Sequence, residues 1–430
     1  MLAEIAQAGL IISADADNAD IVIVNTCGFI APARIEALEA IRHAVSCKAA
    51  GRVKKVIVAG CLAQRAGRQL FGEVKGLDAV VGLERRDEIA DIIVKVLRAD
   101  EQQIFMGQPP DRPTARGKIG PQVHDDRTRL LITPSHWAYL RISEGCDHMC
   151  SFCTIPEIRG RFRSKPMEMV LAEANELVSA GAVELIVIAQ DTTSYGRDLK
   201  IRNGLAVLVS ELENIIALKW IRLMYMCPSG INEQLIQTIA KSERIVHYFD
   251  IPIQHISDRI LKAMRRRESK DSICRLIESL RSAVPDVVLR TTLIVGFPGE
   301  TDEQFAELVE FVKWAKFDAL GCFKYYPESG TAAAEMPDQI PEHVKNRRLE
   351  ELMLTQQRIA FSKNEDKTGA KLSCLVDSVD PDGAGRGRYY GQAPDIDSFC
   401  LIRKCKSKPG RFIDIKVTGA QNYDLIAQQI

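Results

Sequence analysis

The sequence lacks a net charge and lacks any long apolar run. Lys plus Arg and Asp plus Glu both number 57, so the whole molecule has no field that would favour nonspecific binding to nucleic acid or anionic membrane. No run of about eighteen apolar residues occurs, and the first residues have neither a basic region nor a small-residue cleavage site. These absences predict a cytoplasmic protein.

Cysteine, in contrast, is abundant, with twelve residues in the chain. Stable disulfides are rare in a reducing compartment, so some of these thiols are expected to bind metal and the others to be buried. Their spacing must distinguish the two groups. At about 150 residues per domain, a chain of this length should form two or three domains, and we expect three.

The first part of the chain, residues 1–106, alternates short apolar segments with segments of helical period. The apolar segments IVIVNTC, KVIVAGC and DAVVG each precede helix-like text. This alternation predicts a small α/β domain with a parallel sheet. Residues 107–131 are rich in proline, glycine and charge and have no hydrophobic period, so they are predicted to form a linker.

The rest of the chain predicts two more domains. Residues 132–364 contain six strand-like cores separated by segments of helical period, which predicts an incomplete TIM-like (βα)6 barrel ending in a long charged helix, roughly Pro341 to Lys363. Residues 365–430 read as short strands with glycine and proline turns, as in a small β-barrel. From Lys367 onward Lys and Arg outnumber Asp and Glu only ten to seven, and aromatic residues are few, which favours a protein contact over an RNA grip.

Three cysteines, Cys146, Cys150 and Cys153, lie in one short loop directly after the strand-like segment WAYLRI. Barrels of this type place their chemistry in loops at the carboxyl ends of strands. Three thiolates on such a loop can hold three irons of a cubane 4Fe-4S cluster and leave the fourth iron open to a small chelating molecule. The loop therefore predicts an iron-sulfur site with an open coordination position.

Two other interpretations of this triplet compete with the cluster. A zinc site needs a fourth ligand, and the nearby candidate, His148, lies two residues from both Cys146 and Cys150, which gives it a poor reach to the same ion. Chance clustering of buried thiols is the simpler alternative. The CxxxCxxC spacing in a strand-end loop favours the cluster over both.

Two further cysteines, Cys27 and Cys61, end the strand-like segments IVIVNTC and KVIVAGC. Parallel strands place their carboxyl ends at one edge of a sheet, so both thiols should emerge at the same edge. Free cysteine is often only a small apolar filler, but matching positions at two strand ends favour a shared metal site. Cys47 lies inside a helical stretch and is not expected to contribute to it.

The CxxxCxxC triplet resembles the signature of the radical S-adenosylmethionine (SAM) superfamily, and longer motifs narrow the resemblance. The resemblance to the methylthiotransferases of this superfamily implies an N-terminal methylthiotransferase domain, a radical SAM core and a C-terminal TRAM barrel. This resemblance covers essentially the whole chain. The segments that resemble methylthiotransferases are, in order, VNTCGFI, AGCLAQR, EGCDHMCSFCTIP, RGRFRSK, AQDTTSYG, DIPIQHIS, MRRR and IVGFPGET.

Within this family the chain resembles the RimO type, which modifies an aspartate of ribosomal small-subunit protein S-twelve (uS12). It resembles less the MiaB type, which modifies an adenosine of transfer RNA. The segment AQDTTSYG has Asp-Thr where the transfer-RNA enzymes usually have Asn-Val, and YFDIPIQHIS has His255 where they usually have Ser-Gly. The segment PDIDSF, residues 394–399, also resembles the RimO type.

The resemblance also implies the chemistry. A cluster on the triplet would bind the amino and carboxylate groups of S-adenosylmethionine and cleave it to a 5'-deoxyadenosyl radical, which abstracts hydrogen from the β-carbon of the substrate aspartate. Methylated sulfur would come from an auxiliary 4Fe-4S cluster held in part by Cys27 and Cys61. An electron donor such as flavodoxin or ferredoxin is implied, RNA contact through the TRAM domain remains open, and no membrane partner is expected.

Four residues of the core are predicted to bind the cofactor. Gln190 ends the second strand-like core, where enzymes of this kind engage the methionine amino group. Gly296 and Glu300 lie in IVGFPGET, where glycine permits close backbone approach to a nucleoside, although a tight turn and a helix capped by Thr301 explain this text about as well. Arg290 is a charge in an apolar strand that should face the barrel interior or a partner, and could bind the methionine carboxylate or the substrate aspartate.

One departure from the family concerns the auxiliary cluster. Family members carry three N-terminal cysteines, and the first would lie upstream of Cys27 by an interval like that from Cys27 to Cys61, which falls before residue 1. The segment LAEIAQAGL also reads as the tail of a helix ending at Gly9. We therefore expect a truncated or miscalled start, and an auxiliary cluster with two cysteine ligands that would be labile or unformed. Two alternatives stay open: a transfer-RNA methylthiotransferase and a noncatalytic iron-sulfur protein.

Overall fold

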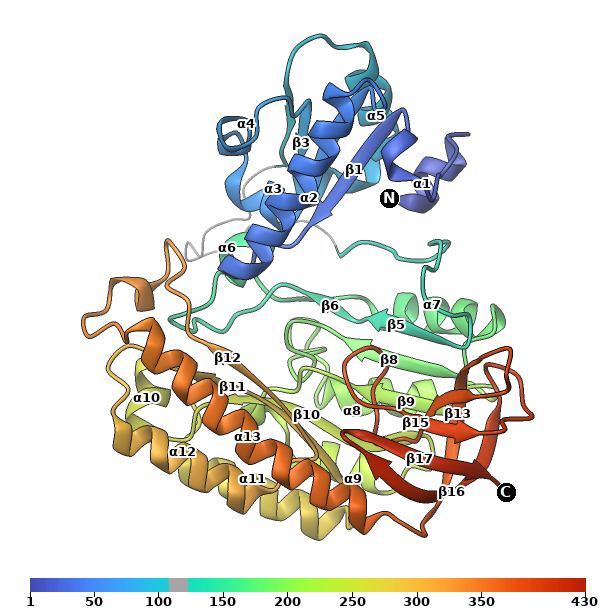
Figure 1. The fold of residues 1–430 in the computed structure, drawn as a ribbon, viewed down its shortest axis with the longest axis vertical. Coiled ribbons are helices and arrows are strands. Elements are labelled where there is room, and N and C mark those ends of the chain that lie inside the picture. Colours follow the sequence, from blue (N-terminus) through green and yellow to red (C-terminus); the bar gives the residue numbers. More distant parts are fainter. Residues whose placement is uncertain (108–122) are drawn as a thin grey trace. The chain divides into compact units, whose positions relative to one another are not determined.

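Figure 1 shows the fold as a computed structural model, which describes residues 1–107 and 123–430. The central part of the predicted linker, residues 108–122, lies outside the described residues. The chain divides into two compact units, and the loop with the three cysteines belongs to the first. That unit comprises Met1–Leu130, Glu144–Arg163 and Tyr326–Ala334, and the second unit comprises Leu131–Ser143, Ser164–Tyr325 and Glu335–Ile430.

A four-stranded parallel sheet forms the centre of the first unit, as the alternating sequence predicts. The sequence does not predict the fourth strand, because its three residues, QIF, follow polar residues and form no apolar segment like DAVVG of the equally short β3. The strands follow chain order: β1 (Ile21–Thr26), β2 (Lys55–Gly60), β3 (Ala79–Val81) and β4 (Gln103–Phe105).

Helices cover both faces of this sheet. Alternate residues of β2 point to opposite faces, so that Val56 and Val58 pack with α2, whereas Ile57 and Ala59 pack with α1 and α5. Burial on both faces is what an almost continuous apolar strand favours. The helices of this unit are α1 (Leu2–Gln7), α2 (Ala31–Ala49), α3 (Cys61–Ala66), α4 (Gln69–Glu73), α5 (Ile89–Arg98) and α6 (Ile155–Arg159), with 3₁₀ turns η1 (Ala16–Asn18) and η2 (Leu83–Glu88).

The second unit is built on a six-stranded parallel sheet, and all six predicted strand cores form it. The strands again follow chain order, as expected for consecutive βα units of an incomplete barrel. The predicted (βα)6 architecture is therefore confirmed. The strands are β5 (Trp137–Arg141), β8 (Glu184–Ile188), β9 (Trp220–Leu223), β10 (Ile245–Gln254), β11 (Val288–Val295) and β12 (Ala319–Lys324).

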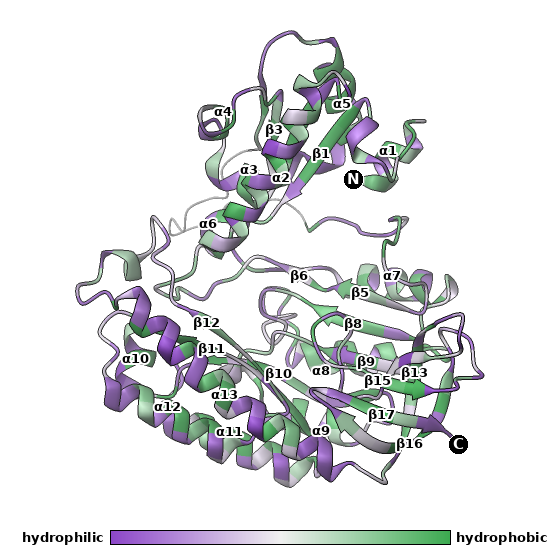
Figure 2. Ribbon diagram, in the orientation of Figure 1, coloured by the Kyte–Doolittle hydropathy of each residue, from purple (hydrophilic) through white to green (hydrophobic). Residues whose placement is uncertain are grey.

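Helices connect these strands, and the long charged helix follows the last of them. Figure 2 shows α13 as largely hydrophilic, and Leu352 on its inner side belongs to the core that it shares with β11 and α12. No helix in the described part of the chain is both long enough and apolar enough to cross a membrane. The helices are α7 (Met167–Ser179), α8 (Gly204–Glu213), α9 (Glu233–Ala240), α10 (Asp258–Ala263), α11 (Lys270–Ala283), α12 (Asp302–Ala315) and α13 (Glu342–Asp366).

The C-terminal residues form a closed five-stranded barrel, as predicted. Its core contains the buried cysteines Cys374 and Cys400, which act there as small apolar side chains. The last strand was not foreseen, because its second half, AQQ, is polar. The strands are β13 (Lys371–Val379), β14 (Gly385–Arg388), β15 (Cys400–Arg403), β16 (Phe412–Gln421) and β17 (Asp424–Gln429), in the order β13-β14-β15-β17-β16.

Buried charges join this barrel to the six-stranded sheet within the second unit. The carboxylate of Glu184 on β8 lies 2.8 Å from Arg222 Nε and 2.7 Å from Arg388 Nη1 of β14. Arg222 Nη1 also donates to the backbone oxygen of Tyr390, at 2.7 Å. All three charged side chains are buried, and a charge removed from water in this way is tolerated only when it is paired. Glu184 therefore fixes the barrel to the core.

Candidate active site

Cys27 and Cys61 follow the ends of two neighbouring strands, as predicted. Thr26 and Gly60, the last residues of β1 and β2, are paired in register, so the two cysteines emerge at the same edge of the first unit's sheet. Cys27 is exposed, whereas Cys61 is the first residue of α3 and is largely buried. The prediction that one sheet edge carries both thiols is confirmed, and their role as metal ligands stays a prediction.

Two glycines let these strand-end segments approach each other. A Cβ atom on Gly28 would lie 2.7 Å from Leu62 Cα, and a Cβ atom on Gly60, whose φ is +94°, would lie 2.6 Å from the backbone oxygen of Thr26. Both distances are shorter than real Cβ contacts, so a larger residue at either position would push the segments apart. The glycines in the segments NTCG and AGC thus allow the two cysteine-bearing segments to lie close together.

The loop with Cys146, Cys150 and Cys153 folds back on itself within the first unit. The amide of Cys146 donates to the backbone oxygen of Gly160, at 3.2 Å, and a Cβ atom on Gly145, whose φ is +80°, would lie 2.1 Å from Arg161 O. Glycine before the first cysteine is therefore required by the closure of the loop. The three thiols stay partly accessible to solvent, as a site for an external cofactor needs.

The donor set of this loop fits a cubane cluster. The amide of His148 donates to Cys146 Sγ and the amide of Ile155 donates to Cys153 Sγ, each at 3.4 Å, and hydrogen bonds to cluster sulfurs of this kind tune iron-sulfur centres. The triplet is not among the groups of described residues whose ligand atoms all lie within 4.8 Å of one another. One shared zinc ion would require all three sulfurs to lie that close together, whereas thiolates that bind three different irons need not.

Arg159 links this loop to Cys61 within the first unit. It lies at the end of α6, which follows the triplet, and its Nη2 donates to Cys61 Sγ at 3.3 Å while Nη1 lies 2.7 Å from Glu144 Oε1. Burial lowers the pKa of Arg159, but the charge of Glu144 and the contact with Cys61 outweigh burial, so its pKa is raised above the ordinary value. A permanent positive charge therefore lies beside a predicted ligand of the auxiliary cluster.

Glu328 is a residue of the first unit that no sequence pattern singles out. Its carboxylate accepts from the amide of Ala31 at 2.6 Å and pairs with Arg65 Nη1 at 2.8 Å, and the same Arg65 nitrogen donates to the backbone oxygen of Gly28. A few residues further on, Ala333 N donates to the backbone oxygen of Ser151 in the triplet loop. The segment Tyr326–Ala334 thus binds both cysteine-bearing parts of the unit.

In the second unit, Gly296 and Glu300 build the turn between β11 and α12. Glu300 is buried, and its Oε2 accepts from the amides of Gly296 and Phe297, the latter at 3.0 Å. A Cβ atom on Gly296 would lie 2.4 Å from Lys345 Cγ, so that this glycine is required by a side chain of α13. Thr301 caps α12 in a capping box with Gln304, which supports the turn-and-cap interpretation of this text.

Gln190 follows the end of β8, at the carboxyl edge of the second unit's sheet, and is half-buried. The next residue, Asp191, holds the following turn, because its Oδ1 accepts from Thr193 N at 3.0 Å and its Oδ2 from Ser194 Oγ at 2.5 Å. These hydrogen bonds within the motif QDTTS fix the backbone that follows Gln190. Its contact with the methionine amino group stays a prediction.

Arg290 faces partners of its own unit. Its Nη1 lies 2.7 Å from Asp250 Oδ1, and its Nε lies 3.6 Å from Asp397 Oδ1 in the segment PDIDSF. Burial lowers the pKa of Arg290, but Asp250 and other neighbouring groups raise it more strongly, so the guanidinium stays charged. The expectation of a partner is correct. The two carboxylates favour a structural role, and the binding of a methionine carboxylate or substrate aspartate by Arg290 stays a prediction.

Comparison with known families divides the chain into three matched parts. Residues 1–82 match the uncharacterized protein family UPF0004, residues 140–312 match the radical SAM superfamily, and residues 368–430 match the TRAM domain. The solved structure of the radical S-adenosylmethionine methyltransferase TsrM from Kitasatospora setae is similar in fold, with a TM-score of 0.50 and 16% identity over 86% of this chain and 69% of that chain. Fold and site together define a radical SAM enzyme with a TRAM domain.

Relatives of similar length narrow this class. The ribosomal protein uS12 methylthiotransferase RimO of Geobacter sulfurreducens is 43% identical over 433 residues, which cover 100% of this chain and 94% of the relative. The RimO protein of Pelotomaculum thermopropionicum is also 43% identical, over 100% of this chain and 95% of the relative. The chain belongs to the RimO family of methylthiotransferases. The cofactors predicted from the triplet, a 4Fe-4S cluster and S-adenosylmethionine, agree with this membership.

Proposed function

We propose that the protein methylthiolates the β-carbon of an aspartate in ribosomal protein uS12. The proposal rests first on the RimO relatives, whose names state this protein substrate and which match the chain over its full length. With a ribosomal protein as substrate, the enzyme would act in the cytoplasm. The TRAM match supports a contact with RNA of the ribosomal particle, and a small reductant protein such as flavodoxin or ferredoxin would supply electrons.

The observation that carries the proposal is the contact between Arg159 and Cys61. Radical cleavage of S-adenosylmethionine alone needs only the triplet, whereas insertion of sulfur needs a second site within reach of it. In the first unit, α6 follows the triplet directly and its Arg159 touches Cys61 at 3.3 Å. The triplet loop and a predicted auxiliary ligand are thus held by one compact body.

The residues of the chain would have separate roles. Cys146, Cys150 and Cys153 would hold the cluster that supplies reductive cleavage of S-adenosylmethionine when bound, and the amides of His148 and Ile155 would support two of the sulfurs. Cys27 and Cys61 would supply two ligands of the auxiliary cluster. Gln190 and the turn at Gly296 and Glu300, all at the carboxyl edge of the second unit's sheet, would orient the cofactor.

An anaerobic assay tests this function. The protein is reconstituted with iron and sulfide, reduced, and incubated with S-adenosylmethionine and either uS12 or transfer RNA. We expect 5'-deoxyadenosine and, from protein in which both clusters are assembled, a methylthio group on one uS12 aspartate. Replacing the triplet by Cys146→Ala, Cys150→Ala and Cys153→Ala should abolish both products, whereas Cys274→Ala, a half-buried helical cysteine, should not. Modification of transfer RNA alone would refute the substrate, and absence of 5'-deoxyadenosine would refute the radical chemistry.

A further inference from the structure

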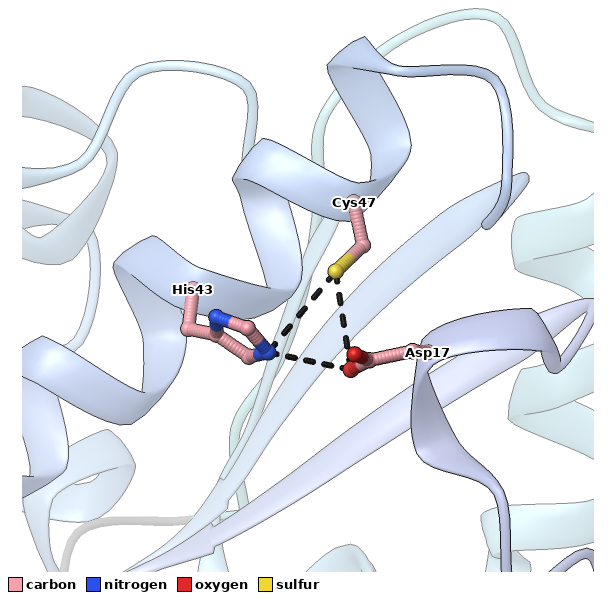
Figure 3. A group of neighbouring side chains, drawn as sticks. All are labelled: Asp17, His43 and Cys47. Carbon is pink, nitrogen blue, oxygen red and sulfur yellow. Dashed lines mark hydrogen bonds and ion pairs between the residues drawn. The ribbon is translucent and has the colours of Figure 1, made fainter.

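Three side chains of different chemistry meet on the first unit at a place that the proposed function does not use. Figure 3 shows His43 and Cys47, both on α2, pointing toward Asp17 of η1. We propose that Asp17, His43 and Cys47 bind a divalent transition-metal ion, and that zinc fits them best. This inference is independent of the methylthiotransferase activity.

The distances among the three ligand atoms fit one tetrahedral ion. Cys47 Sγ lies 3.6 Å from Asp17 Oδ1 and 3.8 Å from His43 Nε2, and His43 Nε2 lies 3.0 Å from Asp17 Oδ1. Ordinary zinc bond lengths at tetrahedral angles separate a sulfur from a nitrogen or oxygen ligand by about 3.6 Å, and a nitrogen from an oxygen ligand by about 3.4 Å. Each pair therefore needs to move by only a few tenths of an ångström.

The local structure brings these ligands together before any ion arrives. His43 and Cys47 are one turn apart on α2 and so share a face of that helix. Asp17 sits in η1, where Asp15 accepts from the amide of Asp17 at 3.1 Å and from Asn18 Nδ2 at 2.8 Å. Cys47 is only 1% exposed, so packing fixes its sulfur. A preformed site reduces the entropy lost on binding.

The donor set selects the kind of metal. A thiolate and an imidazole are ligands that magnesium and calcium avoid, whereas sulfur, nitrogen and carboxylate oxygen together suit zinc. Three protein ligands leave the fourth position of a tetrahedral ion open, and a water molecule can occupy it because Asp17 and His43 lie partly in solvent. His43 and Asp17 are accessible enough for an ion to enter, with 64% and 42% of their side chains exposed.

The site lies at the other edge of the sheet from Cys27 and Cys61. Those two cysteines follow the carboxyl ends of β1 and β2, whereas Asp17 precedes β1 and Cys47 lies near the end of α2, which runs back along the sheet. Cys47 is thus no substitute for an auxiliary-cluster ligand, in agreement with its helical position. A bound ion would instead fasten η1 to α2 and stabilise the entry to β1.

Arg52 competes with the ion for the same ligands. Its Nη2 donates to Cys47 Sγ at 3.3 Å, and its Nη1 lies 3.6 Å from Asp17 Oδ2. Because 45% of this side chain is exposed, it can turn toward solvent when a cation binds. In the metal-free protein Arg52 pairs with the Asp17 carboxylate, and its positive charge repels an incoming cation. Removing Arg52 should therefore strengthen metal binding. If the three side chains only form hydrogen bonds between η1 and α2, removing Arg52 would not raise the affinity for metal.

The test uses the full chain with its iron-sulfur sites reconstituted. Bound zinc is measured by mass spectrometry after dialysis, and Co²⁺ serves as a spectroscopic probe, because a thiolate ligand gives a charge-transfer band. We expect one ion per chain beyond those in the clusters. His43→Gln and Cys47→Ser should each weaken zinc binding by at least about tenfold. Cys47→Ser should also remove the Co²⁺ thiolate band. Matched controls are Cys274→Ser and His343→Gln, a cysteine and an exposed histidine on other helices.

The arginine variant keeps the proposal falsifiable if Cys47→Ser disturbs packing. Arg52→Gln should increase zinc affinity several-fold, and Arg42→Gln, which changes an exposed arginine of α2, should not. Zinc should also raise the unfolding temperature of the unaltered protein and not that of His43→Gln. Equal zinc content in the unaltered protein and in both ligand variants, or no gain in affinity for Arg52→Gln, would overturn the proposal.

Discussion

Cys61 lies beside a half-buried arginine, and this contact is the most direct link between the two cysteine groups. Arg159 is paired with Glu144, so moving the guanidinium away from Cys61 would strain a partly buried ion pair. Hydrogen bonds to ligand sulfurs and other outer contacts strengthen metal sites. The arginine is therefore a positioning residue for the auxiliary ligand.

Replacing this arginine should weaken the auxiliary site. We expect Arg159→Ala to increase the rate of iron loss to a chelator by about tenfold, because outer contacts of this kind change metal affinity by 10 to 100 times. Iron content and the electron paramagnetic resonance signal of the reduced protein measure this loss. Arg161→Ala, an exposed neighbour, is the control. Equal iron loss in the two variants would mean that Arg159 has no part in the site.

Gly28 tests the close approach of the strand-end segments. A Cβ atom there would meet the backbone of Leu62, which cannot move without shifting α3. We expect Gly28→Ala to lower the free energy of unfolding by about 1 to 3 kcal/mol, as overpacking does. Gly72→Ala, where a Cβ atom meets nothing within 4 Å, should be neutral or slightly stabilising in denaturant unfolding. A larger loss for Gly72→Ala than for Gly28→Ala would contradict this account.

For single residues, the sequence predicts positions that follow from the neighbouring residues and does not predict contacts with distant segments. Cys27 and Cys61 could be placed because each directly follows an apolar strand. Glu328 could not, since its partners, Ala31 and Arg65, lie far away in the sequence. The prediction that Arg290 has a partner is correct, but that this partner is Asp250 depends on the register of β10 and β11.

Among the elements, a buried carboxylate of the six-stranded sheet helps to hold the C-terminal barrel. Glu184 bridges Arg222 and Arg388, and its removal would leave Arg222 without its carboxylate partner, and Arg388 with Asp377 alone, in a region closed to water. We expect Glu184→Ala to destabilise the protein by about 3 to 5 kcal/mol, as loss of one partner of a buried ion pair does. Glu243→Ala, at an exposed position, is the matched control in thermal and denaturant unfolding. A change within about 0.5 kcal/mol for Glu184→Ala would contradict the bridge.

Acid should weaken the same contact through Asp377 of β13. Burial raises the pKa of this carboxyl, but hydrogen bonds from His136 and Arg388 outweigh it, so its pKa lies below the ordinary value of 3.8. A carboxyl with a lowered pKa stabilises the folded state above its ordinary pKa and loses this contribution as the pH falls through the folded value. The unfolding temperature should therefore fall more steeply below about pH 4 in the unaltered protein than in Asp377→Asn.

The control for this pH dependence is Asp100→Asn, an exposed carboxyl outside the contact. It should leave the slope below about pH 4 unchanged. If Asp377→Asn and the unaltered protein lose stability in parallel, the barrel contact does not depend on an ionised Asp377.

The predicted elements are those whose own residues form an apolar segment or show a period. The six core strands, and even the three-residue β3, lie in apolar segments, and the long helix α13 extends over many turns. The strand β4 is short and begins with a glutamine, and β17 ends in two glutamines, so pairing with β3 and with β15 and β16 decides their conformation. Local text alone does not contain that information.

For the whole molecule, the compact units differ from a division by sequence pattern. The predicted core begins before the triplet, yet the structure gathers Glu144–Arg163 and Tyr326–Ala334 with the N-terminal sheet. Long-range bonds such as that of Arg65 to Glu328 produce this grouping. The cysteines expected to hold the radical SAM cluster and those expected to hold the auxiliary cluster therefore belong to one body, which supports the proposed chemistry.

The most direct test of this account is the mass of uS12 after reaction with the reconstituted, reduced protein and S-adenosylmethionine. The account predicts that one aspartate gains a methylthio group in place of hydrogen, and that the gain disappears when Cys146, Cys150 and Cys153 are all replaced by alanine. Unmodified uS12 in the presence of a fully assembled enzyme that makes 5'-deoxyadenosine would contradict it.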